Sequence, residues 1–217
     1  MEIGTAYALK QRHRQLRDGH PEALRVRMHR AISWLDRAEH AADDLDARFI
    51  FLWIAFNAAY ASEFGFEQTA RSQVRAFVER LVKLDDGRLH HVLFEQFPGP
   101  VRTLLDNRFV FEPFWRALRE HDPSERWKAQ FDHERRLALR AVMEHGTASL
   151  LATVLDRLHV LRNQLVHGGA TWNSGANRRQ IKDAVAILGT VLPVMLQLMM
   201  DHPDEPFGEI AYPVLPG

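Results

Sequence analysis

The chain has 217 residues, of which 46% are hydrophobic and 26% charged, as in ordinary globular domains. Its 28 basic and 28 acidic side chains balance, which excludes a nucleic-acid binder that relies on overall positive charge, so any RNA contact must come from a local patch. There is no cysteine, which excludes disulfides and Cys-based zinc sites and suits a reducing cytosol. The first ten residues lack the basic segment and apolar run of a signal peptide.

The N-terminal half predicts three helices. The first follows Pro21, because Leu24, Met28, Ile32 and Leu35 recur at helical spacing. A second should start near Asp43 or Asp44 and continue through a stretch, 47–60, that is apolar nearly all round and predicts the central helix of a bundle. A third and more amphipathic helix is expected over 72–84.

The segment 85–146 has a different pattern, with short helical pieces separated by glycines and prolines and a high density of aromatic residues. We interpret it as a helical insertion between the two halves of the bundle. Its last piece, 124–144, should be a longer polar helix with Ser124 as its cap. The aromatic residues are expected to fill a small subsidiary core, with stacking on unpaired bases as the alternative.

Two helices are predicted after the insertion. The first begins at Thr147, carries an apolar stripe from Leu151 to Leu165 and stops at Gly168. The last runs from Asn177 to about Met200. Its uncharged part, 184–200, approaches the shortest membrane span, but glycine, threonine, proline and glutamine interrupt it, so we expect a buried core or dimer-interface helix.

The end of the helix that begins at Thr147 carries the candidate chemistry. Arg162 holds a permanent positive charge, Asn163 follows it, and His167 can give or take a proton near neutral pH. On a helix Arg162 and His167 lie about 140° apart, so one helix cannot easily direct both at one phosphate. Two copies of this helix related by a two-fold axis could direct an arginine and a histidine at the same phosphate. This favours a composite site in a homodimer.

The spacing Arg162-Asn163-x3-His167-Gly168 resembles the Arg-x4-His signature of the HEPN family, and the stretch 51–60 is similar to the corresponding helix of Apea-like HEPN proteins. The resemblance covers 48–84 and 147–200. It implies an all-α antiparallel bundle with its core at about 21–84 and 147–202, and we expect the whole chain, 1–217, to be one such domain. The insertion at about 85–146 is read from the sequence pattern and has no counterpart that we can place in the family. The resemblance also implies a cytoplasmic homodimer that cleaves RNA without a metal or cofactor, in a toxin or phage-defence setting, with an antitoxin or other regulatory protein as a further partner.

In that interpretation Arg162 and His167 are catalytic and Asn163 supports them by orienting the imidazole or contacting phosphate. Four nearby cations are candidates for an RNA-binding track, namely Arg157, Arg178, Arg179 and Lys182. Asn57 is unusual in so apolar a helix, so we expect its amide to hydrogen-bond toward Asn163 or His167. One departure from the family is Gly169, which replaces a tyrosine that some HEPN toxins carry for nucleotide modification.

Several alternatives remain open at this point. The chain could be a non-enzymatic HEPN-type module that binds a nucleotide, RNA or a protein. Locally, His167 could be only a helix cap, and Arg162 could be an ion-pair partner of Asp156 or Asp183. A metal hydrolase is the weakest option, because the histidines at 90, 91, 133 and 145 do not form a His-Glu-x-x-His motif.

Overall fold

The computed structural model describes residues 4–61, 70–175 and 177–213, and every regular element in these ranges is helical. The α-helices are α1 (Ala6–Leu16), α2 (Glu22–Glu39), α3 (Leu45–Tyr60), α4 (Ala70–Leu84), α5 (Arg88–His91), α6 (Pro98–Leu105), α7 (Glu112–Arg119), α8 (Arg126–Met143), α9 (Thr147–Val166) and α10 (Arg178–Asp201). Three short elements join them, the 3₁₀ turns η1 (Arg17–Gly19) and η3 (Arg108–Val110) and the π turn η2 (Val92–Gln96). The prediction of an all-α helical bundle is therefore confirmed.

The helix boundaries follow local signals in the sequence. Asp44 caps α3 by accepting a hydrogen bond of 3.0 Å from the Ala47 amide, as its carboxylate predicted. At α8 the cap is Glu125, which adopts a left-handed backbone with φ of 52°, so the cap lies one residue after the expected Ser124. Ser124 instead bonds through its hydroxyl and amide to Asp122.

Two features of the termini were not predicted. Helix α1 precedes Pro21 and buries Ala6 and Leu9 against the core. The C-terminal tail returns to the bundle, because the buried Arg27 donates hydrogen bonds to the backbone carbonyls of Gly208 and Glu209 as well as to those of Ala59 and Ala61. One buried guanidinium thus joins α2, the end of α3 and the tail.

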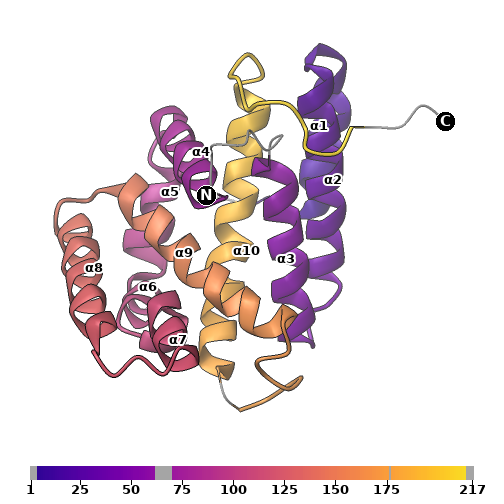
Figure 1. Cartoon of the computed structure of the whole chain (residues 1–217). Helices are drawn as coiled ribbons and strands as arrows, with labels where there is room; N and C mark the ends of the chain where they lie inside the picture. Colours follow the sequence, from indigo (N-terminus) through magenta and orange to yellow (C-terminus); the bar gives the residue numbers. More distant parts are fainter. Residues whose placement is uncertain (1–3, 62–69, 176, 214–217) are drawn as a thin grey trace.

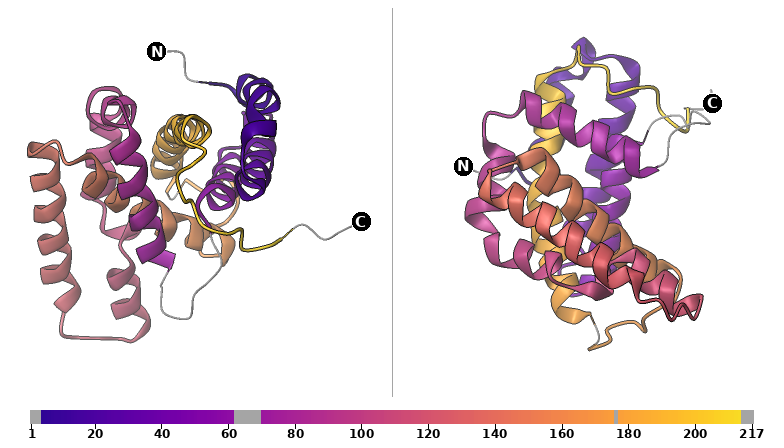
Figure 2. Two further views of the ribbon diagram at one scale, coloured as in Figure 1. Left: turned by 90° about the horizontal axis from the view of Figure 1, so that it is seen from above. Right: turned by 60° about the vertical axis from the view of Figure 1, so that its left-hand side comes forward.

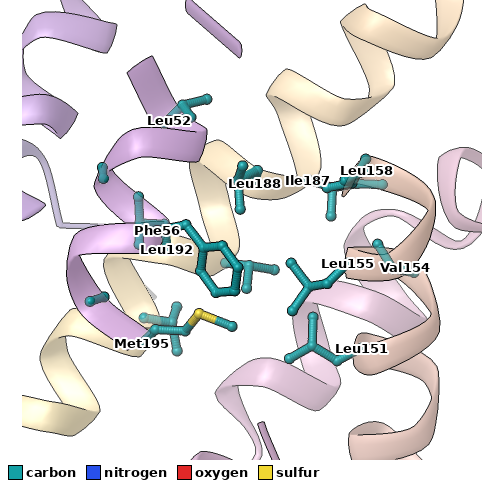
Figure 3. Packing of buried hydrophobic residues seen from close by; sticks show 14 of the residues in the cluster. Leu52, Phe56, Leu151, Val154, Leu155, Leu158, Ile187, Leu188, Leu192 and Met195 are labelled. Atoms are coloured by element: carbon teal, nitrogen blue, oxygen red, sulfur yellow. The ribbon is translucent and has the colours of Figure 1, made fainter. Parts of the chain in front are cut away.

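Helix α10 is the centre of the fold. It lies between the α1–α3 group and the helices that follow α3, and α9 crosses it obliquely (Figure 1). Leu52 and Phe56 of α3 meet Leu188 and Leu192 of α10 and Leu155 of α9 in one continuous core (Figure 3). Helix α10 is long and apolar enough to cross a membrane, but 78% of its most apolar window is buried inside the bundle, which fits the expected core helix.

The insertion does not fold apart from this core. Leu93 of η2 and Leu104 of α6 belong to the same buried cluster as the bundle, and α6 packs on both α9 and α10. The longer helix α8 lies at the outer edge of the molecule, where it packs on α7 and α9 (Figure 2). The insertion therefore extends the bundle along α9 and reaches the helix that carries the Arg-x4-His motif.

Candidate functional site

Helix α9 ends in a tight glycine cap that places the motif. His167 is the C-cap residue, and its amide bonds to the Asn163 carbonyl at 3.0 Å. Gly168 has φ of 69°, a left-handed conformation that glycine adopts without a steric cost. The Gly169 amide then bonds to the Gln164 carbonyl at 2.7 Å and the Gly168 amide to the Leu165 carbonyl at 3.2 Å, which is the Schellman arrangement. The predicted stop at Gly168 is confirmed, and the His167 side chain is exposed at the helix end.

Arg162 is held by its own neighbour. Its Nη1 donates a hydrogen bond of 2.9 Å to Oδ1 of Asn163, and the side chain is half-buried. Within the described residues no carboxylate lies within ion-pair distance of Arg162. Asp156, one of the acids considered for it, pairs instead with Arg71 at 2.8 Å. Arg162 thus keeps an unneutralised positive charge that can attract an anion.

The wall beside Arg162 contains a histidine that sequence reasoning did not select. The His159 imidazole stacks on the Trp53 indole, with ring centroids 5.7 Å apart and planes 11° from parallel. Partial desolvation lowers the pKa of His159, whose side chain stays partly exposed, and the positive charge of Arg162 lowers it further. The signal that could have found it is helical spacing, since residues 159, 162 and 163 share one face of α9.

The aromatic helix α3 also reaches this wall. Tyr60 is half-buried at the end of α3, burial raises the pKa of its hydroxyl, and the charge of Arg162 partly offsets that rise. Asn57 lies between Trp53 and Tyr60 on the same helix face. Its side chain makes no hydrogen bond to another described residue, so the expected bond from Asn57 to Asn163 or His167 is absent. Asn163 Oδ1 is occupied by Arg162, and His167 lies beyond the last turn.

The four cations expected to form an RNA-binding track separate into three environments. Arg157 points inward and is only 3% exposed, with its guanidinium 4.6 Å from the ring centroid of Phe111 and 5.5 Å from that of Phe131. This corrects the expectation for Arg157, because a buried guanidinium does not reach an RNA phosphate. The reason is rotational, since residue 157 falls on the stripe of α9 that packs against the insertion.

The other three cations lie at the start of α10. Arg178 donates to Oδ2 of the buried Asp46 at 2.9 Å and to the Ser174 carbonyl, so its charge is used to hold the preceding loop. Arg179 and Lys182 are exposed and form no ion pair with a described acid. Only these two of the four fit the role of an exposed electrostatic track.

The loop 168–175 is fastened over the start of α3. The Trp172 indole donates to Oδ2 of Asp44 at 3.0 Å, and the Asn173 amide donates to Oδ2 of Asp46 at 2.7 Å. Between this loop and α3 lies a cavity of about 370 Å³ with a largely apolar lining. Val166, directly before His167, is 50% exposed, and Trp172, five residues after it, is 74% exposed. An apolar surface therefore adjoins the motif.

Comparisons of the chain with protein-family models, with curated proteins and with solved structures give no match. The HEPN interpretation accordingly depends on the residues and on the site that they build.

No group of three or more histidine, aspartate or glutamate side chains within the described ranges is placed to hold a metal ion. His90 and His145 do meet, with Nε2 and Nδ1 3.2 Å apart, but as a hydrogen-bonded pair that stacks beside Phe94. The chemistry that the motif itself offers is an unneutralised guanidinium and an exposed imidazole at one end of α9.

Proposed function

We propose that the protein is a metal-independent endoribonuclease of the HEPN type that acts as a homodimer. The observation that carries the proposal is the pairing of an unneutralised Arg162, oriented by Asn163, with an exposed His167 in the last turn and cap of the same helix. A guanidinium can hold a phosphodiester and stabilise the charge that builds on it, and an imidazole can transfer protons near neutral pH. These are the groups that strand cleavage needs.

The reaction uses a nucleophile that RNA itself supplies. His167 takes the proton of the 2′-hydroxyl, and the 2′-oxygen forms a bond to phosphorus. The bond from phosphorus to the 5′-oxygen breaks, and this oxygen receives a proton from an imidazolium, so charge and protons balance. The products are a 2′,3′-cyclic phosphate and a free 5′-hydroxyl. DNA lacks the 2′-hydroxyl and is not a substrate.

Two features support a composite site in a dimer. The helical offset between Arg162 and His167 separates the two side chains on one helix, and no hydrogen bond joins them in the part of the chain that the structure describes. The exposed apolar side chains of Val166 and Trp172 line a cavity next to the motif, and Phe51, on which Trp34 stacks, lines the same cavity. Two-fold association through this surface would bring the ends of two α9 helices together.

The first experiment compares the wild-type protein with His167→Ala and Arg162→Gln on tRNA and on a mixed-sequence single-stranded RNA, with EDTA present. We expect cleavage by the wild type alone, with 3′ ends that carry a cyclic phosphate. His29→Ala is the matched control, because His29 is an exposed histidine of α2. Cleavage by a purified, folded His167→Ala protein at the wild-type rate would contradict the mechanism.

A mixing experiment tests the composite site. If one protomer supplies Arg162 and the other His167, a heterodimer of Arg162→Gln with His167→Ala retains one intact site. Random exchange of the two inactive variants should then restore roughly a quarter of the wild-type rate. No recovery, with subunit exchange verified, would place both groups of each site in one protomer.

A further inference from the structure

A second candidate binding site lies in the insertion, on the side where it meets the start of α10 at Gln180. It is a cavity of about 730 Å³, a size within the range of small-molecule sites, and it opens widely to solvent. Three aromatic side chains line it, Phe109 of η3 and Trp127 and Phe131 of α8, together with the cations Arg108 and Lys128. We call it the aromatic cavity.

The rings of this cavity are available for stacking. Phe109 is 41% exposed although its backbone is fixed in η3, and Trp127 and Phe131 are half-buried. Phe131 is fixed from behind by an edge contact with Phe111, with centroids 5.2 Å apart, and by the buried guanidinium of Arg157. Rings that are rigid and partly open to water lose little entropy when a flat ligand stacks on them.

The cavity also carries an unpaired positive charge. The Arg108 guanidinium is exposed, lies 5.0 Å from the Phe109 ring centroid and forms no ion pair with a described acid. Of the two acids in the lining, Asp106 is neutralised by an ion pair with Arg135, and Asp132 is exposed. Lys128 lies over Trp127 at 6.0 Å and pairs with Glu125. Arg108 is thus the cation best placed to hold a phosphate.

The aromatic cavity is connected directly to the motif. Gln164, two residues after Arg162, donates a hydrogen bond of 2.6 Å from its Nε2 to the Phe109 carbonyl. The same carbonyl accepts the Trp115 indole N–H at 2.8 Å, and Gln164 Oε1 accepts from Asn177 at 2.7 Å. These bonds fix η3, the end of α9 and the start of α10 relative to one another.

We propose that the aromatic cavity binds an unpaired nucleotide of a single-stranded RNA, with its base on Phe109 or Trp127 and its phosphate on Arg108. This inference deepens and rests on the proposed function, since it assigns unpaired RNA as the substrate class of the motif. A base inside a duplex cannot present its face to these rings, whereas a splayed base can. A purely apolar peptide would leave the Arg108 charge without a partner.

Binding is measured separately from cleavage, in the full-length His167→Ala protein, by fluorescence anisotropy. The probe is a fluorescein-labelled oligouridine of about ten nucleotides, and a hairpin duplex of equal length is the comparison. We expect Phe109→Leu and Trp127→Leu each to weaken single-strand binding by roughly five- to tenfold. Arg108→Gln should weaken it and reduce its salt dependence. Tyr7→Leu is the matched control, because Tyr7 is an exposed aromatic residue on α1.

A cross-linking measurement avoids dependence on how the variants fold. An oligomer that contains 5-iodouridine, irradiated on the His167→Ala protein, should attach to the peptide that holds Phe109 or the one that holds Trp127. Equal affinity of the control and of both ring variants, tighter binding of the duplex, or cross-links confined to other peptides would each overturn the proposal. If RNA stacks in the aromatic cavity but the wild type does not cleave it, the ribonuclease proposal is rejected and the nucleotide site is retained. If the wild type cleaves RNA that does not stack here, the nucleotide site is rejected and the ribonuclease proposal is retained.

Discussion

The His159 imidazole stacks on the Trp53 indole at 5.7 Å, almost parallel, and thereby joins the motif helix α9 to the aromatic helix α3. Both helices are recognisable in the sequence, and a contact between them was expected through Asn57, but this stack was not. The stack places a second imidazole in the electrostatic field of Arg162. This makes His159 a direct reporter of where the Arg162 charge lies.

The pKa of His159 should depend on Arg162. Partial desolvation and the neighbouring positive charge both lower it from the ordinary value of 6.5, so Arg162→Gln should raise the pKa of His159 toward that value. The measurement is an NMR titration of the histidine ring carbons, with His159→Gln used to assign the signal. Arg179→Gln, which removes an exposed arginine of α10, is the control and should leave the value unchanged. An identical His159 pKa in the wild type and in Arg162→Gln would contradict the geometry.

Gln164 should act as a structural connector of the site. Gln164→Ala removes hydrogen bonds to the Phe109 carbonyl and the Asn177 amide, so we expect the free energy of unfolding to fall by about 1–2 kcal/mol. Urea unfolding followed by circular dichroism measures this change. Gln130→Ala, at an exposed position of α8, should shift stability by less than about 0.5 kcal/mol. Equal effects of the two substitutions would show that the connection contributes nothing.

Arg157 should contribute through packing rather than through RNA contact. Its guanidinium packs against the rings of both Phe111 and Phe131 and is 3.8 Å from the Glu134 carboxylate, and burial lowers its pKa. Arg157→Met keeps the volume and removes the buried charge, so stability should change by less than about 1 kcal/mol or increase. Arg157→Ala should lose about 2 kcal/mol or more, because it leaves a cavity beside the two rings.

RNA binding provides the second readout for Arg157. In the His167→Ala protein, Arg157→Met should bind single-stranded RNA as tightly as its parent, because the side chain is buried. A loss of affinity with a reduced salt slope and an unchanged fold would restore Arg157 to the binding surface. Anisotropy at several salt concentrations makes this distinction.

Among the basic residues at the start of α10, we expect Arg179 and Lys182 to contribute to RNA binding and Arg178 to stability. Arg179→Ala with Lys182→Ala should weaken RNA binding and lower the slope of log affinity against log salt by about 0.7 for each phosphate that these two side chains neutralise. Arg178→Ala should act mainly on stability, because Arg178 holds Asp46 and the loop before α10. A salt slope that falls for Arg178→Ala and stays constant for the exposed pair would contradict this division.

Acid should destabilise the fold through buried histidines of the N-terminal region. Burial lowers the pKa of His13, and the charges of His20, His29 and Arg17 lower it further; burial also lowers the pKa of His20. The unfolded chain therefore binds protons more readily than the folded one below pH 6.5. The free energy of unfolding is therefore highest above about pH 6.5. It decreases as the pH falls from 6.5 through the lowered pKa values of His13 and His20.

Urea unfolding at pH 7.5 and at pH 5.5 tests this expectation, with the wild type losing stability at the lower pH. The double variant His13→Gln, His20→Gln should lose less between the two conditions. His121→Gln, at an exposed turn, serves as the control. An equal loss in the double variant and the wild type would assign the acid sensitivity to other groups.

The sequence by itself determined the longer helices and the position of the motif. Hydrophobic spacing, the carboxylate of Asp44 and the left-handed preference of Gly168 act within a few residues, so they are readable without a fold. The same local logic predicted the buried α10 and placed His167 at a helix end. The short helices of the insertion and helix α1 lack strong periodic patterns, and their boundaries were predicted poorly or not at all.

Only the tertiary structure decided which way the functional side chains face. Arg157 and Arg162 are five residues apart on α9, yet Arg157 is buried against two phenylalanines and Arg162 keeps an unneutralised charge beside the helix end. The stack of His159 on Trp53 and the bond from Gln164 to Phe109 join positions more than 50 residues apart. Such contacts depend on the rotation of α9 against two other elements, which is set by packing of the whole core rather than by any local pattern.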